Sequence, residues 1–273
     1  MHALIDGDLV CYRSAASANN DPLDVAIHRT DNLIRELLTQ VNADTYTAYL
    51  TGKSNFRKEI NPEYKANRKD QEPPRWLEEC KEFLILEWKA KMSEYYEADD
   101  LLGIEQCRVS NINDGCAFAL YNETPTIIIS LDKDLKMIPG EHYSWEIGTA
   151  TWTKAAEFTT TTKESGIRRF YEQMLVGDVT DNIIGIAGLG PVKSKKYLSS
   201  AETEQDLFDL VYNKYDDPER FIMNAQCLWI CQNIGETWAH RANGLILDEY
   251  MTELRNAAII QTTSLFNTTV PEE

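Results

Sequence analysis

The sequence predicts an α/β fold with a mostly parallel central sheet flanked by helices. Short apolar runs alternate with segments whose apolar residues recur at helical spacing, and this alternation is typical of parallel strands joined by crossover helices. Two of the predicted strands end in acidic residues. With 273 residues, of which 43% are hydrophobic, the chain is long enough for one large α/β domain or two modest ones.

The predicted elements alternate along the first half of the chain and become mainly helical in the second. The predicted strands are residues 3–6, 45–50 and 124–132, followed by a terminal hairpin of 143–147 with 149–152. The predicted helices are residues 22–41, 75–91, 98–112 and 167–178, with further helices to about residue 262. A polar, basic stretch over 52–74 is too long for an ordinary connection. We place the domain boundary near residue 155, giving domains of residues 1–155 and 156–273.

The acidic composition excludes some classes of function. The formal net charge is −17 and the pI is near 4.7, so the average surface repels phosphate and a general nucleic-acid coat is excluded. No apolar run approaches the roughly 18 residues that a membrane span needs. The start, MHALIDGDLV, lacks the basic region and cleavage site of a signal peptide. We therefore expect a cytoplasmic protein with no membrane partner.

The cysteines and histidines predict neither a zinc site nor covalent catalysis. The six cysteines form no CxxC pair and are expected to be buried free thiols: Cys11, Cys80, Cys107, Cys116, Cys227 and Cys231. Cys227 and Cys231 are one helical turn apart and His240 follows, but the other half of a zinc set is absent. The four histidines show no paired spacing, so a Ser-His-Asp or Cys-His mechanism has no support.

Four acidic clusters coincide with the ends of predicted elements. They are Asp6 with Asp8, Glu97 with Asp99 and Asp100, Asp132 with Asp134, and Asp178 with Asp181. Each acid alone is explained as a helix cap or a turn residue. A cap needs one carboxylate per helix, however, and several clusters supply two or more. Carboxylate oxygens without His or Cys suit Mg²⁺ or Mn²⁺, and two such ions about 4 Å apart activate water against a phosphodiester.

Two basic segments supply groups that a phosphate substrate needs. The first spans residues 53–69 and contains Lys53, Arg57, Lys58, Lys65, Arg68 and Lys69. There Tyr64 adds an aromatic face for an unpaired base, although a solvated charged helix explains the same pattern. The second is Lys193, Lys195 and Lys196, which follow the glycine-rich GIAGLGPV with Gly188 and Gly190. Glycines permit tight turns whose N–H groups accept a phosphate at a helix start.

Five segments, in this order, resemble the bacteriophage and bacterial 5′ nuclease family of 5′→3′ exonucleases and flap endonucleases. They are LIDGD (4–8), FRKEINPEYKANRK (56–69), EADDLLG (97–103), IIISLDKDLKMI (127–138) and VGDVTDNIIGIAGLGPVKSKKYL (176–198). Within this family, the five segments most resemble those of the short phage 5′ exonucleases. The resemblance implies a helical arch over about 52–92 and, in the C-terminal helical region, a helix-three-turn-helix motif over about 176–200.

The resemblance also implies roles for the acidic and basic residues. The metal ligands would be Asp6, Glu97, Asp99, Asp100, Asp132, Asp134, Asp178 and Asp181, holding two Mg²⁺ or Mn²⁺ ions. Asp8, which some relatives lack, would be a further ligand that compensates for Gly52. The catalytic residues would be Lys65, Arg68, Asp132 and Asp134. The DNA-binding residues would be Lys53, Arg57, Lys58, Tyr64, Lys65, Arg68, Lys69, Gly188, Gly190, Lys193, Lys195 and Lys196. A monovalent cation such as K⁺ would bind the helix-three-turn-helix.

The implied activity is hydrolysis of DNA at or near free 5′ ends. The substrates would be duplex, nicked or flap DNA or an RNA primer, in phage replication, primer removal or host DNA degradation, with replication proteins as partners and the cytoplasm of an infected host as the location. One position departs from the family: many members carry an Asp where this chain has Gly52.

Three other functions stay open at this level. A carboxylate-metal ribonuclease shares the acidic parallel sheet but does not explain the glycine-rich segment after residue 184. A DNA-structure binder with a decayed metal site is suggested by Gly52. A regulatory domain that binds a small phosphorylated ligand with Mg²⁺ would also place acids at strand ends.

Overall fold

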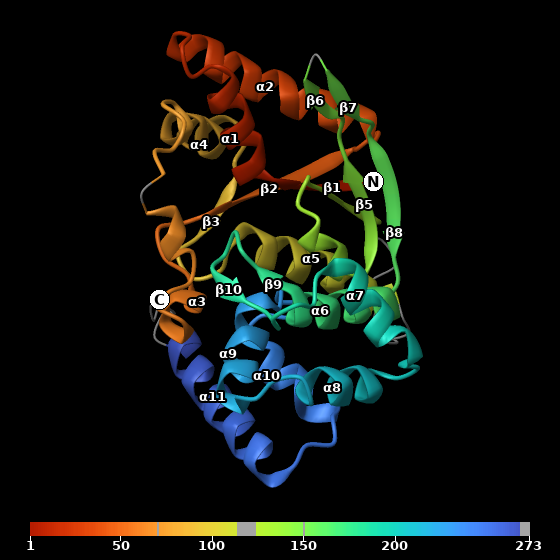
Figure 1. Ribbon diagram of the computed structural model, residues 1–273. Coiled ribbons are helices and arrows are strands. Elements are labelled where there is room, and N and C mark those ends of the chain that lie inside the picture. The colour runs from red at the N-terminus through yellow and green to blue at the C-terminus, as the bar shows by residue number, and fades with distance from the viewer. Residues whose placement is uncertain (70, 114–123, 150, 268–273) are drawn as a thin grey trace. The chain divides into compact units, whose positions relative to one another are not determined.

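Figure 1 shows the computed structural model, which describes residues 1–69, 71–113, 124–149 and 151–267. The chain divides into two compact units: Met1–Lys53 with Glu72–Thr162, and Ser54–Gln71 with Lys163–Glu273. This division differs from the predicted boundary near residue 155. It also divides the predicted arch over 52–92, because residues 54–71 group with the C-terminal half of the chain and residues 72–92 with the first unit.

The core of the first unit is a sheet that has six strands among the described residues. They are β1 (His2–Asp6), β2 (Thr45–Thr51), β3 (Lys91–Ser93), β4 (Thr126–Ile129), β5 (Gly140–Ser144) and β8 (Glu157–Thr161). The order is β3-β2-β1-β4-β5-β8, and all neighbours are parallel except β5 and β8. Ile5 of the central β1 lies opposite Ala48 and Ile129. The predicted mostly parallel sheet is confirmed.

Helices cover both faces of this sheet, as predicted (Figure 1). On one face α1 (Gly7–Ser17), α2 (Leu23–Gln40) and α4 (Leu77–Glu87) pack together. On the other face α5 (Ala98–Asn113) packs against β1, β2 and β4. Side chains alternate between the two faces along a strand, so Ala3 and Ile5 join the core beneath α1, and Leu4 is buried on the opposite face. Because parallel strands end at one edge, the acids after β1 and β4 share the carboxyl edge.

Several elements of the first unit differ from the sequence prediction. Residues 143–147 and 149–152 do not form the predicted hairpin, because Tyr143 belongs to β5 of the main sheet. The hairpin instead joins β6 (Ile147–Thr149) to β7 (Trp152–Lys154). The sequence analysis missed α1, β3 and β8. The sequence signals of β3 and β8 are weak, because β3 has three residues and β8 reads EFTTT with an exposed face. A short helical turn, η2 (Asp134–Met137), follows β4.

The second unit is mainly helical. Its helices and helical turns are α3 (Phe56–Ile60), η1 (Ala66–Arg68), α6 (Lys163–Val176), α7 (Pro191–Tyr197), η3 (Leu198–Ser200), α8 (Glu204–Tyr212), α9 (Pro218–Leu228), α10 (Trp238–Arg241), η4 (Ala242–Gly244) and α11 (Glu249–Asn267). A small antiparallel pair, β9 (Gly177–Asp178) with β10 (Ile183–Ile184), follows α6. The ring of Trp238 lies 5.5 Å from Phe221 and 6.4 Å from Phe208 in a buried aromatic core. The helix-three-turn-helix over 176–200 stays a prediction.

Two expectations from composition concern the helices and the thiols. Across the described ranges, no helix combines the length and the apolar character needed to cross a bilayer. The cysteines of the described ranges are buried, as expected: Cys11, Cys80, Cys107, Cys227 and Cys231. Cys116 lies outside the described residues.

Candidate active site

Asp6 occupies the centre of the carboxyl edge of the sheet. It is the last residue of β1 and caps α1, because its Oδ1 accepts a hydrogen bond from the backbone N–H of Leu9 at 3.1 Å. Its Oδ2 accepts a hydrogen bond from the hydroxyl of Ser130 at 2.7 Å. The residue is 3% exposed. The carboxylate of Asp6 therefore caps α1 and is also buried at the candidate site.

Ser130 connects the acids that follow the two central strands. It comes directly after β4, and its Oγ accepts the backbone N–H of Asp132 at 2.9 Å while donating to Asp6. The Oδ1 of Asp132 in turn accepts the N–H of Asp134 at 2.7 Å. The structure therefore brings Asp6 and Asp132 together, as predicted from their strand ends. The sequence analysis missed Ser130, whose signal was its place immediately after the buried strand.

The electrostatics of this cluster favour a cation. Burial, together with the charge of Asp8 and a smaller effect of Asp132, raises the pKa of Asp6 to about 7, although the hydrogen bonds from Ser130 and Leu9 oppose the shift. A carboxyl group with a raised pKa is one whose ionised form lacks stabilisation. A divalent ion beside these carboxylates would supply it.

Asp8 has a cationic partner within the first unit. Its Oδ2 accepts the backbone N–H of Thr51 at 2.9 Å, and its Oδ1 lies 3.1 Å from Nζ of Lys81 on α4. Burial alone would lower the pKa of Lys81, but the Asp8 carboxylate, with smaller effects of Glu78 and Cys11, raises that pKa overall. The cation that Asp8 holds is therefore Lys81. The sequence analysis missed Lys81 because a single lysine within a helical pattern carries no signal.

The third acidic group lies at the start of α5. Glu97 is 6% exposed and Asp100 is fully buried. The backbone N–H of Glu97 donates to Oδ2 of Asp100 at 3.1 Å, and that of Ala98 donates to Oγ1 of Thr51 at 2.9 Å. Thr51 thus connects the end of β2 to both α1 and α5. Carboxylates here are also favoured by the positive end of the helix dipole.

Gly52, the position that departs from the family pattern, has no room for a side chain. A Cβ on Gly52 would lie 2.5 Å from the carbonyl oxygen of Ser93 and 2.8 Å from the carboxylate of Glu94. Glu94 follows β3, and its Oε2 accepts the backbone N–H of Lys53 at 3.0 Å. The end of β2 therefore carries a carboxylate from the neighbouring strand. The sequence analysis missed Glu94 because it missed β3.

The first unit fits a hard divalent ion by the chemistry of its donors. The predicted ligands Asp6, Asp132 and their neighbours offer carboxylate oxygens, which suit Mg²⁺ or Mn²⁺. The raised pKa of Asp6 indicates that its own ionised carboxylate lacks a compensating charge. In the part of the chain that the structure describes, no three His, Cys, Asp or Glu side chains are grouped closely enough to hold an ion by themselves. Donor type and electrostatic need support the site, and the ligand set stays a prediction.

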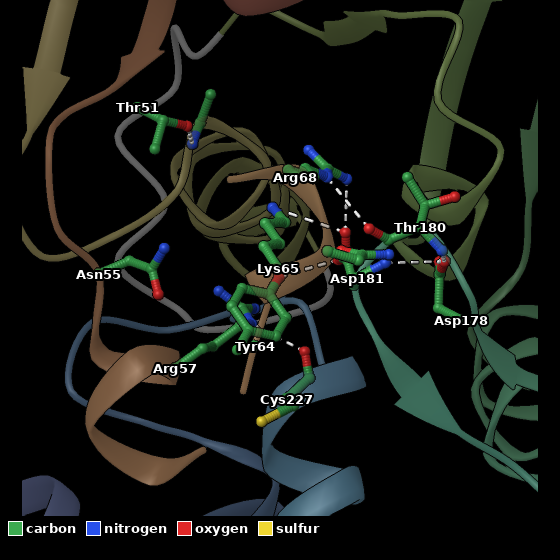
Figure 2. A network of polar contacts seen from close by, with 12 residues as sticks. Thr51, Asn55, Arg57, Tyr64, Lys65, Arg68, Asp178, Thr180, Asp181 and Cys227 are labelled. Carbon is green, nitrogen blue, oxygen red and sulfur yellow. Dashed lines mark hydrogen bonds and ion pairs between the residues drawn. The ribbon is translucent and has the colours of Figure 1, made fainter. Parts of the chain in front are cut away.

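Asp178 and Asp181 belong to the second unit and have different surroundings. Oδ1 of Asp178 accepts the backbone N–H groups of Thr180 at 2.7 Å and of Asp181 at 3.3 Å, which shapes the turn between β9 and β10. Figure 2 shows Tyr64, Lys65 and Arg68 converging on Asp181. The sequence predicted Tyr64, Lys65 and Arg68 as contacts to DNA and Asp181 as a metal ligand, and it gave no sign that the three contact Asp181.

Two predicted DNA-binding residues are buried instead of exposed. Arg57 is 2% exposed, and its guanidinium donates to the carbonyl oxygens of Cys227 at 2.8 Å and Trp229 at 2.7 Å. It therefore satisfies carbonyls at the end of α9. Tyr64 is 4% exposed, and its hydroxyl donates to Asp181. Neither side chain is accessible for the predicted contact, because helical spacing and charge do not reveal what a residue packs against.

The other predicted basic residues remain on the surface. Lys53, Lys58, Lys69, Lys195 and Lys196 are exposed. In the glycine-rich turn Lys193 donates from Nζ to the carbonyl oxygen of Gly188 at 3.0 Å, and Gly188 has φ +80°, which favours glycine. Gly190 precedes α7, which begins with Pro191. These positions are compatible with phosphate contact.

Fold and site together define a class: an α/β protein with buried carboxylates at the carboxyl edge of a parallel sheet. Residues 1–169 match the family model described as 5'-3' exonuclease, N-terminal resolvase-like domain. That match covers more than half of the chain, and the chain belongs to this family.

Individual relatives agree with this assignment. The chain is 31% identical over 148 residues to the exonuclease of Escherichia phage T7, which covers 51% of this chain and 42% of that protein. It is 29% identical over 223 residues to DNA polymerase I of Bacillus caldotenax, which covers 75% of this chain and 24% of the polymerase. The matched region thus spans less than half of either relative.

Solved structures share the fold. A T5 5'-exonuclease structure with bound divalent metal ions (zinc) has a TM-score of 0.59 and 17% identity, covering 98% of this chain and 99% of that one. A bacteriophage T5 D15 flap endonuclease variant, in a complex with DNA and metal ions, has a TM-score of 0.55 and 16% identity, covering 96% and 99%. At these identities the likeness establishes the fold alone.

Proposed function

We propose that this chain is a divalent-metal-dependent 5′→3′ exonuclease or flap endonuclease that hydrolyses DNA phosphodiester bonds at or near free 5′ ends. The observation that carries the proposal is the buried Asp6, whose pKa is raised to about 7 by burial and by the neighbouring Asp8 and Asp132. In a chain of the 5'-3' exonuclease family, a buried carboxylate with other acids near it at the carboxyl edge of a parallel sheet is where catalytic ions are expected.

The proposed ligands in the first unit are Asp6, Glu97, Asp99, Asp100, Asp132 and Asp134. Bound Mg²⁺ or Mn²⁺, in two sites, would supply a hydroxide nucleophile near neutral pH and stabilise the leaving oxygen. Asp8 is not proposed as a direct metal ligand, because its carboxylate already contacts Lys81 and the backbone N–H of Thr51. The T5 exonuclease structures with metal ions support this proposal by likeness of fold.

The chain's own groups orient this site and hold the substrate. Ser130 donates to Asp6 and accepts from the backbone of Asp132, so it fixes both carboxylates relative to each other. Lys65 and Arg68 are the proposed contacts to the reacting phosphate. No covalent intermediate on the chain is needed, because water is the nucleophile.

Duplex DNA would contact the exposed lysines around the glycine-rich turn. Lys195 and Lys196 are exposed on α7, and the turn carbonyls are the proposed ligands of a monovalent cation such as K⁺. The proposed substrates are DNA ends at a duplex terminus, a nick, a flap or an RNA primer, with replication proteins as partners. Support comes from the T5 flap endonuclease complex with DNA.

The experiment is a product ladder from 5′-labelled substrates. Blunt duplex, nicked duplex and 5′-flap DNA are incubated with the chain in Mg²⁺ and in EDTA. We expect labelled nucleotides or short flaps with Mg²⁺ and none with EDTA. Absence of products in Mg²⁺, with DNA binding retained, would favour the DNA-structure binder suggested by Gly52. Products from RNA alone would favour the ribonuclease.

A further inference from the structure

We propose that a groove between α2 and α4 of the first unit binds a partner protein, through a segment that carries a large apolar side chain flanked by Lys or Arg. The groove has a volume of about 1050 Å³. Small-ligand sites hold roughly 300–1,000 Å³, so this groove has room for several side chains of a peptide. We call it the α2–α4 groove, and the inference does not depend on the proposed function.

The walls of the α2–α4 groove are apolar side chains of two helices that pack against each other (Figure 1). Leu23 and Ile27 are one turn apart on α2, and Phe83 of α4 lines the same space. Leu23 is 37% exposed, and Ile27 and Phe83 are half-buried. An apolar side chain of a partner would remove this surface from water, which favours binding.

The floor of the α2–α4 groove is aromatic. Trp88, which follows α4, and Tyr46 of β2 have ring centroids 5.3 Å apart at an interplanar angle of 60°. The indole N–H of Trp88 donates to Oδ1 of Asp31 at 3.1 Å, and the guanidinium of Arg35 lies 5.2 Å from the Trp88 ring centroid. Arg35 also forms an ion pair with Asp31 at 2.7 Å. The chain's own contacts therefore hold the floor in place before a partner binds, which lowers the cost of binding.

The charge of the α2–α4 groove is negative. Its acidic side chains are Asp24, Asp31 and Glu87, and its cation is Arg35, which is paired with Asp31. Within the described ranges, neither Asp24 nor Glu87 forms an ion pair. Glu87 is the last residue of α4, where the negative end of the helix dipole disfavours a carboxylate. Lys or Arg beside the apolar side chain of a partner would compensate Asp24 and Glu87.

Charge also argues against other occupants of the groove. Nucleic acid and anionic lipid would bring phosphate groups to acidic side chains, which repel them. A second copy of the chain carries a formal net charge of −17, so self-association is opposed by repulsion between the copies. A segment with Lys or Arg is attracted by the same charge.

The α2–α4 groove lies away from the carboxyl edge of the sheet. Tyr46 is the second residue of β2 and pairs with Ala3, whereas Asp6 pairs with Tyr49. Three residues of strand, roughly 10 Å, separate these positions. A bound segment would therefore leave the acids of the carboxyl edge accessible, so the groove serves attachment to a partner and not inhibition.

The first test measures binding of three labelled synthetic peptides of equal length to the full chain by fluorescence anisotropy. One peptide combines Lys with Phe and Leu, the second has Ser in place of the apolar residues, and the third has Glu in place of Lys. The second peptide measures attraction to the acidic chain as a whole. The first should bind roughly tenfold or more tightly than either of the others. Equal binding of the two Lys peptides, or equally tight binding of the Glu peptide, would overturn the proposal.

Paired variants then locate the bound peptide. Leu23→Ser removes part of an apolar wall, and its control Leu86→Ser changes an exposed leucine outside the groove. Glu87→Lys reverses a charge of the groove, and its control Glu82→Lys makes the same change at an exposed acid of α4 outside it. Leu23→Ser and Glu87→Lys should each weaken binding of the first peptide roughly three- to tenfold, with little change in the controls. Equal effects in a variant and its control would contradict binding in the groove.

Two further measurements separate this proposal from its alternatives. Sedimentation equilibrium should give the same mass for wild type and Leu23→Ser, and a dimer that only Leu23→Ser dissociates would show that a second copy occupies the groove. Single-turnover cleavage should be equal in wild type and Leu23→Ser, and its loss would contradict the separation of the groove from the carboxyl edge. If wild type cleaves no DNA, the proposed function fails, while peptide binding still decides the role of the groove.

Discussion

Asp6 is the last residue of β1 and Asp181 lies in the turn after β9, and the surroundings of these two aspartates are opposite. Asp6 is buried beside Asp8 and Asp132, and its pKa is raised. Asp181 is surrounded by Lys65, Arg68 and the hydroxyl of Tyr64. The carboxylate of Asp6 has a raised pKa because it is buried beside other acids, whereas cationic side chains of the chain contact the carboxylate of Asp181. An acidic motif therefore does not define a metal ligand until its neighbours are known.

The largest expected effect is loss of cleavage in Asp132→Asn. The amide keeps an oxygen that can accept the N–H of Asp134, so the fold should persist, but it removes a proposed ligand of the metal. Single-turnover cleavage of a 5′-flap substrate should fall by roughly a thousandfold or more. DNA binding measured in Ca²⁺ should change little. Cleavage at the wild-type rate would contradict the role of Asp132 as a metal ligand, because Asp132 would then matter no more for cleavage than an exposed acid such as Asp209.

Arg57→Gln tests whether a cationic side chain of the second unit stabilises its fold. Arg57 is buried and donates to the carbonyls of Cys227 and Trp229. Glutamine is shorter and uncharged, so the variant loses the two charge-assisted hydrogen bonds to these carbonyls, which should lower the free energy of unfolding by about 2–4 kcal/mol. Urea unfolding measures this, with the exposed Lys58→Gln as control. Equal stability of both variants would show that Arg57 is not structural.

The pH dependence of stability tests the first unit. The pKa of Asp6 is raised from its ordinary 3.8 to about 7, so between about pH 4 and pH 7 the folded chain binds more protons than the unfolded chain. Without metal, the free energy of unfolding therefore falls as pH rises through this window. In EDTA, wild type should lose about 1–4 kcal/mol more than Asp6→Asn between pH 5 and pH 8. Identical losses would contradict the assigned electrostatics.

The smallest expected effect concerns Lys81, the cation next to the uncompensated cluster. Lys81→Met leaves Asp8 without its ion pair and should cost about 1 kcal/mol in EDTA, a fall in Tm of roughly 2–4 °C. The fall should be smaller in Mg²⁺, since a bound ion would replace the lost charge. Lys81→Arg is the charge-preserving control. An equal fall with and without Mg²⁺ would separate Lys81 from the metal site.

The sequence predicted most of what depends on local pattern. The strands over 3–6, 45–50 and 124–132 are apolar or β-branched runs, and burial in a parallel sheet selects for such runs. Acids at the carboxyl ends of β1 and β4 then had to share an edge. This geometric consequence of parallel pairing is why Asp6 and Asp132 were placed together correctly.

What the sequence could not show depends on contacts between distant residues. Arg57 and Tyr64 have the composition of a nucleic-acid surface, yet they are buried against Cys227 and Asp181, more than a hundred residues away along the chain. Glu94 was missed because it depends on the three-residue β3, which pairs with β2. Charge and spacing say which groups are present, and only packing decides which of them face solvent.

Titration of the metal-free chain with Mn²⁺, read by calorimetry at pH 7.5, tests the central claim most directly. We expect wild type and the control Asp209→Asn, which changes an exposed acid of α8, to bind Mn²⁺ with equal affinity. Asp6→Asn should bind Mn²⁺ at least a hundredfold more weakly, because loss of a direct ligand should exceed the 10- to 100-fold effect of an outer contact. Failure of wild type to bind Mn²⁺, or wild-type affinity in Asp6→Asn, would contradict the account.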